Sequence, residues 1–564
     1  MHSERLTETR LPKRIALPVF ASDVLSSVAY APDEIFLTLA FAGVAALSYS
    51  AWIGLGVVFV MLIVVASYRQ NVHAYPSGGG DYEVATTNLG GRSGLTVASD
   101  LLVDYVLTVA VSVSSAQYAA AAIPSRRGHE AIAAVIVVII LMTMNLRGVR
   151  ESGTAFAIPT YTFMVAIVGM GAFGLIRWAL GDLPLAESAG LTTARLPEFD
   201  QGLTGLAWGF LLLRAFSSGC AALTGVEAIS NGVPAFKVPK SKNAATTLAL
   251  LGGIAVTMLM SILVLGNLMH VRYAEKPATQ LLRDGKPVGV DYVQDPIIGQ
   301  IAKALFAGFP PAFYLVAATT GLILVLLAAN TAFNGFPVLG FVGVSISFTT
   351  SQTGMVRHRT RLLRTETDPA RRRHMQRSRV VNSVGLTITG LVLVIVLVTK
   401  FVRGAYLALA AMALLYLLML GIRRHYQAVR RELEGGERYE SRASRPSLLE
   451  SITVTVDAED TEQLRREWDA RDIPVPLRAL ESPYREITGP VVDYVKSIRR
   501  ESPRDLVVVD VPEYVVGHWW EQVLHNQSAL RLKARLHYTP GTERETEIEK
   551  AEIEKAELAE AGRS

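Results

Sequence analysis

The sequence is poor in the residues that build disulfides and charged surfaces. Among 564 residues there is one cysteine, Cys220, so an intrachain disulfide and a metal site made of several cysteines are both excluded. We interpret Cys220, which lies in an apolar segment, as a small buried side chain. Only 19% of the residues are charged, below the roughly 25% that is usual for soluble globular proteins.

Long hydrophobic runs take the place of these residues, and half of the chain is hydrophobic. Runs of 18 or more apolar residues recur between residues 15 and 423, and each is long enough to cross a bilayer as a helix. The polar N-terminus and the full length of the first run do not fit a cleavable signal peptide. The sequence therefore predicts a membrane protein with spans at about 15–40, 51–68, 95–120, 131–146, 154–178, 205–230, 244–269, 312–338, 381–400 and 402–422.

The distribution of basic residues predicts how the chain lies in the membrane. The connectors near 43–50 and 181–204 carry at most one basic residue each. Lysine and arginine gather instead in residues 145–152, 236–243, 357–379 and 423–431. By the positive-inside rule we expect these clusters and both termini in the cytoplasm of a cell (plasma) membrane protein. Because the arginine cluster flanks a span, the lipid bilayer is the expected partner and nucleic acid is not.

Two of the predicted spans are interrupted at corresponding depth. The first contains "SDVLSSVAYAPDE" (22–34), with a break expected at "SSVAYAP", and the sixth contains "SSGCAALTGVEAISNGVP" (217–234). A broken helix is tolerated in a membrane where it lines a cavity or faces protein. Two broken helices five spans apart are typical of an inverted-repeat transporter with its binding site at the breaks. The alternative is that the small residues only pack an ordinary helical bundle.

Ionisable residues inside these spans are the first candidates for function. Each costs on the order of 3 kcal/mol in a bilayer and marks a transport pathway by default. Asp23 precedes the first break, Asp104 lies in the third span, and Glu227 lies in the sixth-span break. Each acid could instead form a structural pair within the bundle, for which Arg214 is the obvious partner.

Hydroxyl groups accompany these acids. Thr108 and Ser112 follow Asp104 at i+4 and i+8 and share its helix face, and Thr224 lies beside Glu227. Carboxylates, hydroxyls and unwound carbonyls suit a cation that prefers oxygen ligands. The first break contains no glycine, and Glu227 would repel an anion at the sixth, so an inorganic cation is favoured over an amino acid. A carboxylate that titrates as it meets its cation would also suit proton coupling.

The glycine-rich segment "YPSGGGDY" (75–82) lacks the Gly-Lys-Ser/Thr of a phosphate loop. We interpret it as a flexible cytoplasmic connector. The sequence contains no Ser/His/Asp or metalloprotease arrangement, so we expect a protein that is not an enzyme and uses no cofactor.

The sequence of the C-terminal part predicts a separate soluble unit. We expect a cytoplasmic N-terminal tail (1–12), a transporter domain (13–425), a linker (426–446), an α/β domain with a parallel sheet (447–540) and a charged tail (541–564). Strands are expected at 451–456, 475–480 and 505–512, and helices at 461–471, 489–500 and 519–536.

Several of these segments together resemble the KimA-type potassium importers of the KUP family. The family belongs to the amino acid–polyamine–organocation superfamily and has a LeuT-like inverted-repeat fold. The resemblance covers most of residues 13–540 and rests on "SDVLSSVAYAPDE", "YPSGGGDY", "LLVDYVLTVAVSVSS", "NLRGVRES", "AFSSGCAALTGVEAISNGVPAFK", "AANTAFNGFP", "SQTGM" and "HNQSAL". It implies proton-coupled potassium uptake by a homodimer whose cytoplasmic domain senses cyclic di-AMP. The cation-site positions that it implies are Asp23, Tyr30, Asp104, Thr108, Ser112, Thr224 and Glu227, with Asp104 and Glu227 as proton relays.

The chain departs from this family in two places. The family has twelve spans and this chain about ten, because a ninth span and the start of a tenth are absent after residue 340; Gly340 takes the place of a site tyrosine. Residues 312–353 form one apolar run, about 63 Å long as a single helix, so a kink at Pro337 or a segment along the interface is expected. The α/β domain resembles a universal-stress-protein fold that lacks its first strand and most of its first helix. The missing span keeps a transport-dead membrane sensor open as an alternative, and an amino acid or polyamine permease stays open because many relatives of the family are labelled as amino acid permeases.

Overall fold

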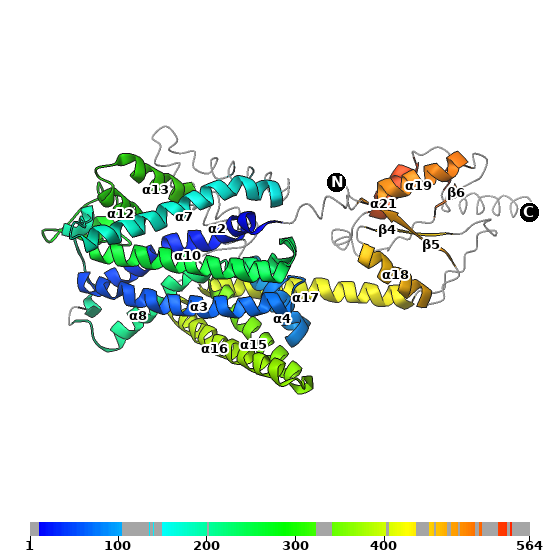
Figure 1. The fold of residues 1–564 in the computed structure, drawn as a ribbon, viewed down its shortest axis with the longest axis horizontal. Helices are drawn as coiled ribbons and strands as arrows, with labels where there is room; N and C mark the ends of the chain where they lie inside the picture. Colours follow the sequence, from blue (N-terminus) through cyan, green and yellow to red (C-terminus); the bar gives the residue numbers. More distant parts are fainter. Residues whose placement is uncertain are drawn as a thin grey trace, which may run out of the picture. The chain divides into compact units, whose positions relative to one another are not determined.

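The computed structural model describes residues 11–103, 106, 135, 139, 149–199, 202–322, 341–401, 405–435, 450–455, 458–470, 475–482, 486–501, 507–509, 528–537 and 542–543. The chain forms two compact units, one of residues 10–421 and a second that holds the C-terminal part from residue 422. Figure 1 shows the helices of the first unit and the small α/β arrangement of the second.

The first unit is a bundle of membrane-length helices. Among the described residues, six helices are long and apolar enough to cross a membrane, or seven if the two bent halves of α2 count as one span. They correspond to seven of the ten predicted spans; 131–146 and much of 95–120 and 312–338 lie outside the described residues. The helices are α2 (Lys13–Ala40), α3 (Ser50–Ala74, preceded by the 3-10 helix η1, Val44–Tyr49), α7 (Val149–Ala179), α8 (Gly205–Gly219), α10 (Lys240–Leu268), α16 (Pro369–Lys400) and α17 (Ala405–Gly435).

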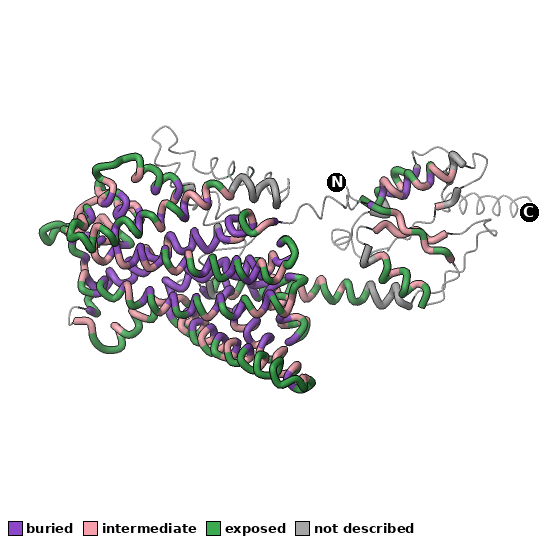
Figure 2. Tube along the Cα trace, in the orientation of Figure 1, coloured by how far each residue is buried: buried purple, intermediate pink, exposed green. Residues whose placement is uncertain are grey.

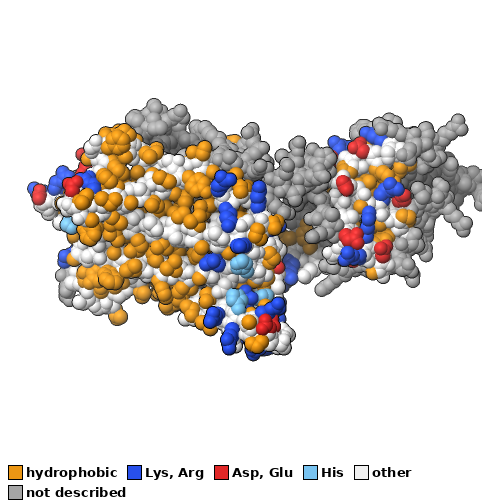
Figure 3. All heavy atoms as spheres, in the orientation of Figure 1, with side chains coloured by type: hydrophobic (Ala, Val, Ile, Leu, Met, Phe, Trp, Pro, Cys, Tyr) orange, Lys and Arg blue, Asp and Glu red, His pale blue; other side chains and the backbone are white. Residues whose placement is uncertain are grey.

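Helix α2 lies at the centre of this bundle. It packs against α7, α8 and α10, and α10 in turn packs along α3. Buried residues therefore run along α2, α3 and α10 (Figure 2). The outer surface is apolar over most of its length, with Trp52, Val165 and Leu206 exposed, as expected for side chains that face lipid (Figure 3).

The first span bends, but not at the predicted position. The segments Lys13–Ala21 and Asp23–Ala40 meet at an angle of 40°, so the bend lies at Ser22. The prediction of a break at "SSVAYAP" is wrong, because α2 continues through it and past Pro32. The segment has no glycine, and the Ser26 hydroxyl donates a hydrogen bond to the Asp23 carbonyl oxygen (2.7 Å), which supports the backbone next to the bend.

The break predicted in the sixth span is confirmed. Helix α8 ends at Gly219 and is followed by the 3-10 turn η5 (Cys220–Leu223). Thr224 is extended, Gly225 has φ of 84°, and the chain resumes a helix as α9 (Glu227–Asn231). A residue with a side chain is strained at this positive φ, so the break depends on glycine at this position.

The glycine-rich segment after α3 is ordered, and the prediction of a flexible connector is wrong. Gly78, Gly79 and Gly80 all have positive φ, and they turn the chain directly into α4 (Gly80–Leu89). A Cβ at Gly80 would collide with the Asn231 side chain, so α4 begins in close contact with the end of α9. A helix that covers residues 91–103 follows.

Several elements outside the long helices were not predicted. A three-stranded antiparallel sheet joins β1 (Thr192–Thr193), β2 (Leu281–Arg283) and β3 (Lys286–Pro287), with Thr192 opposite Leu282 and Leu282 opposite Pro287. The short helices η3 (Glu187–Gly190), η4 (Pro197–Phe199), α11 (Pro277–Gln280) and α12 (Ile297–Leu305) lie in the same connectors, and η6 (Val233–Ala235) follows α9. Strands of two or three residues are too short to show the alternating pattern on which prediction depends.

The long apolar run of residues 312–353 does not appear as one described helix. Helix α13 (Pro310–Leu322) covers its beginning, and α15 (Phe341–Thr365) begins near its end and packs along α16. Pro337, where a kink was predicted, and Gly340 both lie outside the described residues.

The C-terminal unit alternates strands and helices as predicted. Strands β4 (Ser451–Thr455) and β5 (Leu477–Glu481) are parallel, with Ser451 opposite Leu477, and are connected by α18 (Ala458–Ala470). Helix α19 (Thr488–Glu501) and α21 (Ser528–His537) supply the small core, which contains Val495 and Leu532. Strand β6 (Val507–Val508) pairs in parallel with β7 (Thr542–Glu543).

Two expected boundaries of this unit differ from the structure. Strand β7 lies inside the segment expected to be a charged tail. Helix α17 continues to Gly435, well into the expected linker. Its last turns, "RRHYQAVRREL", consist largely of good helix formers, and their charge made them resemble a linker in the sequence.

Candidate functional site: buried carboxylates at the broken helices

A cluster of hydroxyl groups joins the bent first span to the broken sixth span. Thr224 Oγ1 lies 2.6 Å from Ser27 Oγ, in a hydrogen bond between residues 197 positions apart in the chain. The Tyr30 hydroxyl donates to Ser27 Oγ at 3.2 Å, one turn further along α2. Ser27 and Thr224 are fully buried. The extended backbone at Thr224 is what allows its side chain to reach across to α2.

Asp23 lies directly beside this cluster and against the break. It is fully buried, and a Cβ at Gly225 would lie 2.5 Å from Asp23 Oδ2. Glycine is therefore needed at residue 225 for its positive φ and also for the space that the Asp23 carboxylate occupies. Neither carboxylate oxygen of Asp23 has a hydrogen-bond partner among the described residues.

Glu227 is the first residue of α9, two positions after Gly225. Its side chain is only 3% exposed, and Oε2 has no hydrogen-bond partner within the described parts of the chain. Asp23 and Glu227 interact electrostatically across the break. The break therefore brings two buried carboxylates and three hydroxyl groups, those of Ser27, Tyr30 and Thr224, into one site.

A second group of carboxylates was missed in the sequence. Asp81, the second residue of α4, is buried and accepts hydrogen bonds from the Tyr68 hydroxyl (2.5 Å) and from Ser347 Oγ (2.8 Å). Asp100, on the helix that covers 91–103, is fully buried, and a Cβ at Gly343 would collide with its carboxylate. An aspartate directly after three glycines was the available signal for Asp81, and the position of Asp100 inside the predicted third span (95–120) was the signal for that residue.

A buried polar network continues from this second group along α3, α15 and α16. Ser67 Oγ lies 2.5 Å from Gln352 Oε1 and 2.7 Å from Asn382 Oδ1. Asn71 Nδ2 donates to Ser351 Oγ at 3.1 Å. Ser67, Asn71, Ser351, Gln352 and Asn382 are all buried. These hydrogen bonds tie three helices together through side chains that are distant in sequence.

The four buried acids share one electrostatic property. No ion pair between described residues involves Asp23, Asp81, Asp100 or Glu227. Buried carboxylates without a counter-charge are expensive, and oxygen-rich surroundings suit hard cations. The arrangement can therefore hold a cation or a proton at the break.

The predicted site residues fall into two groups. The structure brings Asp23, Tyr30, Thr224 and Glu227 together, whereas Asp104, Thr108 and Ser112 lie outside the described residues. Arg214, considered as a partner for one of the acids, has its guanidinium 4.9 Å from the centre of the Phe41 ring. Cys220 is buried in η5, as expected.

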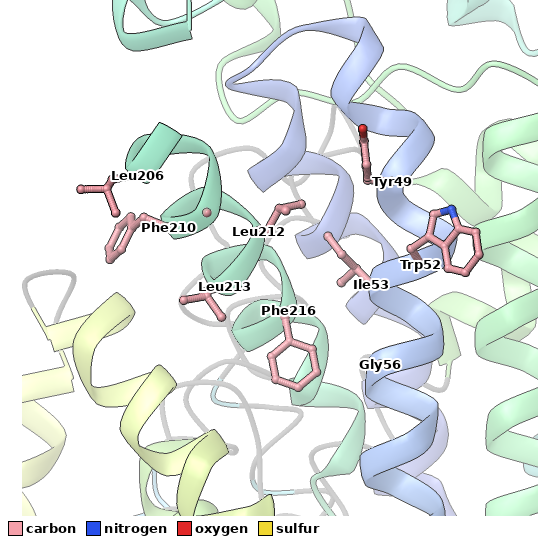
Figure 4. A pocket seen from close by; sticks show the side chains of 10 residues that line it. Tyr49, Trp52, Ile53, Gly56, Leu206, Phe210, Leu212, Leu213 and Phe216 are labelled. Atoms are coloured by element: carbon pink, nitrogen blue, oxygen red, sulfur yellow. The ribbon is translucent and has the colours of Figure 1, made fainter. Parts of the chain in front are cut away.

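A large hollow among the described residues of the unit lies elsewhere. It has a volume of about 780 Å³ and lies between η1 with the start of α3 and α8, where Trp52, Phe210 and Phe216 line it (Figure 4). The polar side-chain atoms of its lining are those of Tyr49 and Trp52. A groove so apolar is a poor site for an ion, and it shares no lining residue with the site at the break.

Residues 19–422 match a protein-family model described as amino acid permease. Together with the membrane-length helices, this match defines the class: the chain is a helical, multi-pass membrane transporter of the amino acid permease type. Membership in a transporter class agrees with the expectation that the protein is not an enzyme.

The comparisons also show the particular family. Residues 439–543 match the model of the KimA potassium transporter C-terminal domain. The potassium transporter KimA of Bacillus subtilis (strain 168) is 32% identical over 615 residues, which cover 95% of each chain. The chain belongs to the family of KimA potassium transporters. The alignment is longer than this chain, so it contains gaps in this chain.

Solved structures give weaker likenesses. Two crystal structures of mutants of a manganese transporter from Eremococcus coleocola are 12% identical, cover 72% of this chain and 93% of theirs, and have a TM-score of 0.29. The same transporter in complex with an aromatic bis-isothiourea compound is 13% identical over the same shares, with a TM-score of 0.28. Scores this low carry no argument about the site.

Proposed function

We propose that the protein is a secondary active transporter that imports potassium coupled to protons. The observation that carries the proposal is the pair of buried carboxylates, Asp23 and Glu227, which lie at the break of the sixth span and form no ion pair with any described residue. A transported potassium ion would supply that counter-charge. The 32% identity to a potassium transporter, over 95% of each chain, supports potassium as the transported ion.

The residues at the break have complementary roles in this proposal. Asp23, the hydroxyls of Ser27, Tyr30 and Thr224, and the backbone at Gly225 bind the dehydrated ion through oxygen atoms. Glu227 balances charge: it is ionised when potassium is present and takes up a proton when potassium leaves, because two adjacent buried carboxylates do not both stay charged without a cation. Asp104, Thr108 and Ser112 would complete the site from the third span.

The other properties of the family are also proposed for this chain. They are an inverted-repeat, LeuT-like arrangement of the spans, a homodimer, cytoplasmic termini, and regulation by cyclic di-AMP bound to the C-terminal unit. The alternating strands and helices of that unit and the match of residues 439–543 support a regulatory role.

An amino acid or polyamine permease is the alternative that the family model over residues 19–422 favours. An amino acid has a carboxylate, and Asp23 and Glu227 would repel it at the place where the half-helices meet. A transport-dead sensor is the alternative that the missing ninth span favours. It predicts nucleotide binding without ion flux.

Growth of a potassium-uptake-deficient host under potassium limitation tests the proposal. We expect the chain to restore growth and Glu227→Gln to abolish this rescue at equal membrane expression. Lack of rescue by the well-expressed unmodified chain would contradict potassium import. Uptake of a labelled amino acid that does not depend on potassium would support the permease instead.

A further inference from the structure

The acids Asp81 and Asp100 lie on one face of α15. Asp81 is hydrogen-bonded to Ser347, and the Asp100 carboxylate touches Gly343, four residues earlier on the same helix. Residues four apart lie one above the other on a helix, about one turn or 5.4 Å along its axis. The two carboxylates are therefore stacked about one helical turn apart, although they come from two different helices.

Both carboxylates keep oxygens that no described residue satisfies. Asp81 Oδ1 and both oxygens of Asp100 have no hydrogen-bond partner within the described parts of the chain. Asp81 is 1% exposed and Asp100 is fully buried, so solvent does not take the place of these partners. A buried polar oxygen without a partner is costly, and an ionised one far more so.

The charged groups that face the pair add to this cost. The charged side chains that act on Asp100 are Asp81, from α4, and Glu227, from α9. The polar groups from the remaining described elements are the hydroxyls of Tyr68 from α3 and of Ser347 and Ser351 from α15, and the backbone N–H of Ser347, which faces Asp100. None of these groups is a cation, so Asp81, Asp100, Tyr68 and Ser347 together offer six side-chain oxygen atoms and net negative charge.

We propose that Asp81, Asp100, Tyr68 and Ser347 form a second binding site for a monovalent cation, separate from the site at Asp23 and Thr224. Oxygen ligands from carboxylates and hydroxyls suit an alkali metal ion. One such ion between the stacked carboxylates supplies the positive charge that the described side chains around them do not. This inference rests on the proposed function, and it adds that the protein holds two potassium ions at once.

The second site adjoins the first through α9. The start of α4 contacts the end of α9 at Gly80 and Asn231, and Glu227 begins the same short helix. Glu227 interacts electrostatically with both Asp81 and Asp100, so the two groups of carboxylates are close enough to influence each other. The ion would bind at the second site after it leaves the first.

Equilibrium binding of ⁸⁶Rb⁺ to the purified full-length protein in detergent tests the proposal by counting ions per chain. We expect two ions for the unmodified chain, one for Asp100→Asn and one for Glu227→Gln. Asp182→Asn, a matched change of an exposed acid that is paired with Arg177, should keep both. Ser347→Ala, which keeps all charges, should weaken one of the two ions roughly tenfold.

The outcomes separate this inference from the proposed function. One ion in the unmodified chain, lost in Glu227→Gln and kept in Asp100→Asn, overturns the second site and leaves potassium binding at the break intact. Loss of both ions in Asp100→Asn overturns the claim that the sites are separate. No bound ion in any variant overturns both proposals. Thermal unfolding without rubidium checks the fold: Asp100→Asn should be at least as stable as the unmodified chain, because it removes an uncompensated buried charge.

Discussion

The acids near the surface of the C-terminal unit and the acids buried in the membrane unit differ in whether a described basic residue neutralises them. In the C-terminal unit, Glu450 pairs with Arg478 at 3.0 Å and Glu486 pairs with Arg535 at 2.9 Å, both near the surface. In the membrane unit, Asp23, Asp100 and Glu227 are buried and belong to no ion pair between described residues. The paired acids are neutralised within the fold, whereas the buried ones require a counter-charge that the described chain does not supply.

The contrast between paired and unpaired acids indicates which acids have a functional role. An exposed ion pair is worth about 0–1 kcal/mol and can be replaced with little effect. A buried, unpaired carboxylate lowers the stability of the fold. Its presence therefore indicates a functional role, such as reversible binding of a transported cation. Changes in the two kinds of acid and in their surroundings test this contrast, beginning with the change of largest expected effect.

Gly225→Ala should abolish transport. The new Cβ would lie 2.5 Å from Asp23 Oδ2, and the φ of 84° would cost a residue with a side chain about 1–2 kcal/mol. We expect more than a tenfold loss of potassium uptake in cells at equal expression. Gly253→Ala, in α10 where a Cβ meets nothing within 4 Å, should leave uptake unchanged. Equal uptake by the two variants would contradict the packing of Asp23 against the break.

Tyr68→Phe should weaken the second carboxylate group without unfolding the chain. It removes the hydroxyl that donates to Asp81 at 2.5 Å, a hydrogen bond to a charged group worth about 1.5–3 kcal/mol. Uptake should fall by about tenfold or more, as measured from initial rates. Tyr314→Phe removes a hydroxyl from an exposed residue of α13 and serves as the control. A rate that Tyr68→Phe leaves unchanged would indicate that Asp81 takes no part in transport.

Asn382→Ala should lower stability more than it lowers affinity for potassium. It removes the amide that contacts Ser67 Oγ and Gln70 Oε1 and leaves buried polar groups unsatisfied, at a cost of about 1–3 kcal/mol. Thermal unfolding in detergent should show a lower Tm. Thr387→Ala, on the same helix with a hydroxyl bonded to the Ser383 carbonyl one turn earlier, should change Tm little. A Tm equal to that of the control would show that the network does not stabilise the bundle.

Glu450→Gln should have the smallest effect. A hydrogen bond from Tyr494 and then the charge of Arg478 lower the pKa of Glu450, so its stabilising contribution is present above the usual glutamate pKa of about 4.3 and is lost as the pH falls below it. Hydrogen exchange of β4 and β5 in the full chain should be slightly faster in the variant at pH 7. The difference in exchange rate between the variant and the unmodified chain should shrink toward pH 4. A difference that grows toward pH 4 would contradict a lowered pKa of Glu450.

Residue patterns in the sequence were sufficient to locate the long helices of this protein. Hydropathy located the described membrane helices, because a run of about 20 consecutive apolar residues is rare outside membrane spans. The sixth-span break was predictable from Gly225 and its polar neighbours, and the cost of Asp23 and Glu227 in lipid pointed to the site. The match to the amino acid permease model and to KimA confirms the class and the family.

The remaining features depend on contacts that no local pattern contains. The bend at Ser22 and the continuous helix through Pro32 belong to α2, which is packed among α7, α8 and α10, and the local sequence of α2 predicted neither of them. The burial of Asp81 depends on Tyr68 and on Ser347, which is 266 residues away in the chain. Glycine-rich segments look flexible in a sequence, and only the tertiary structure shows that these glycines turn the chain into α4.

Potassium flux into proteoliposomes is the most direct test of the claim that buried, unpaired acids carry the function. The unmodified chain, Glu227→Gln and Asp182→Asn would be reconstituted at equal protein content. We expect flux through the unmodified chain, equal flux through Asp182→Asn, whose acid is exposed and paired, and no flux through Glu227→Gln. Undiminished flux through Glu227→Gln, or none through the unmodified chain, would contradict the claim.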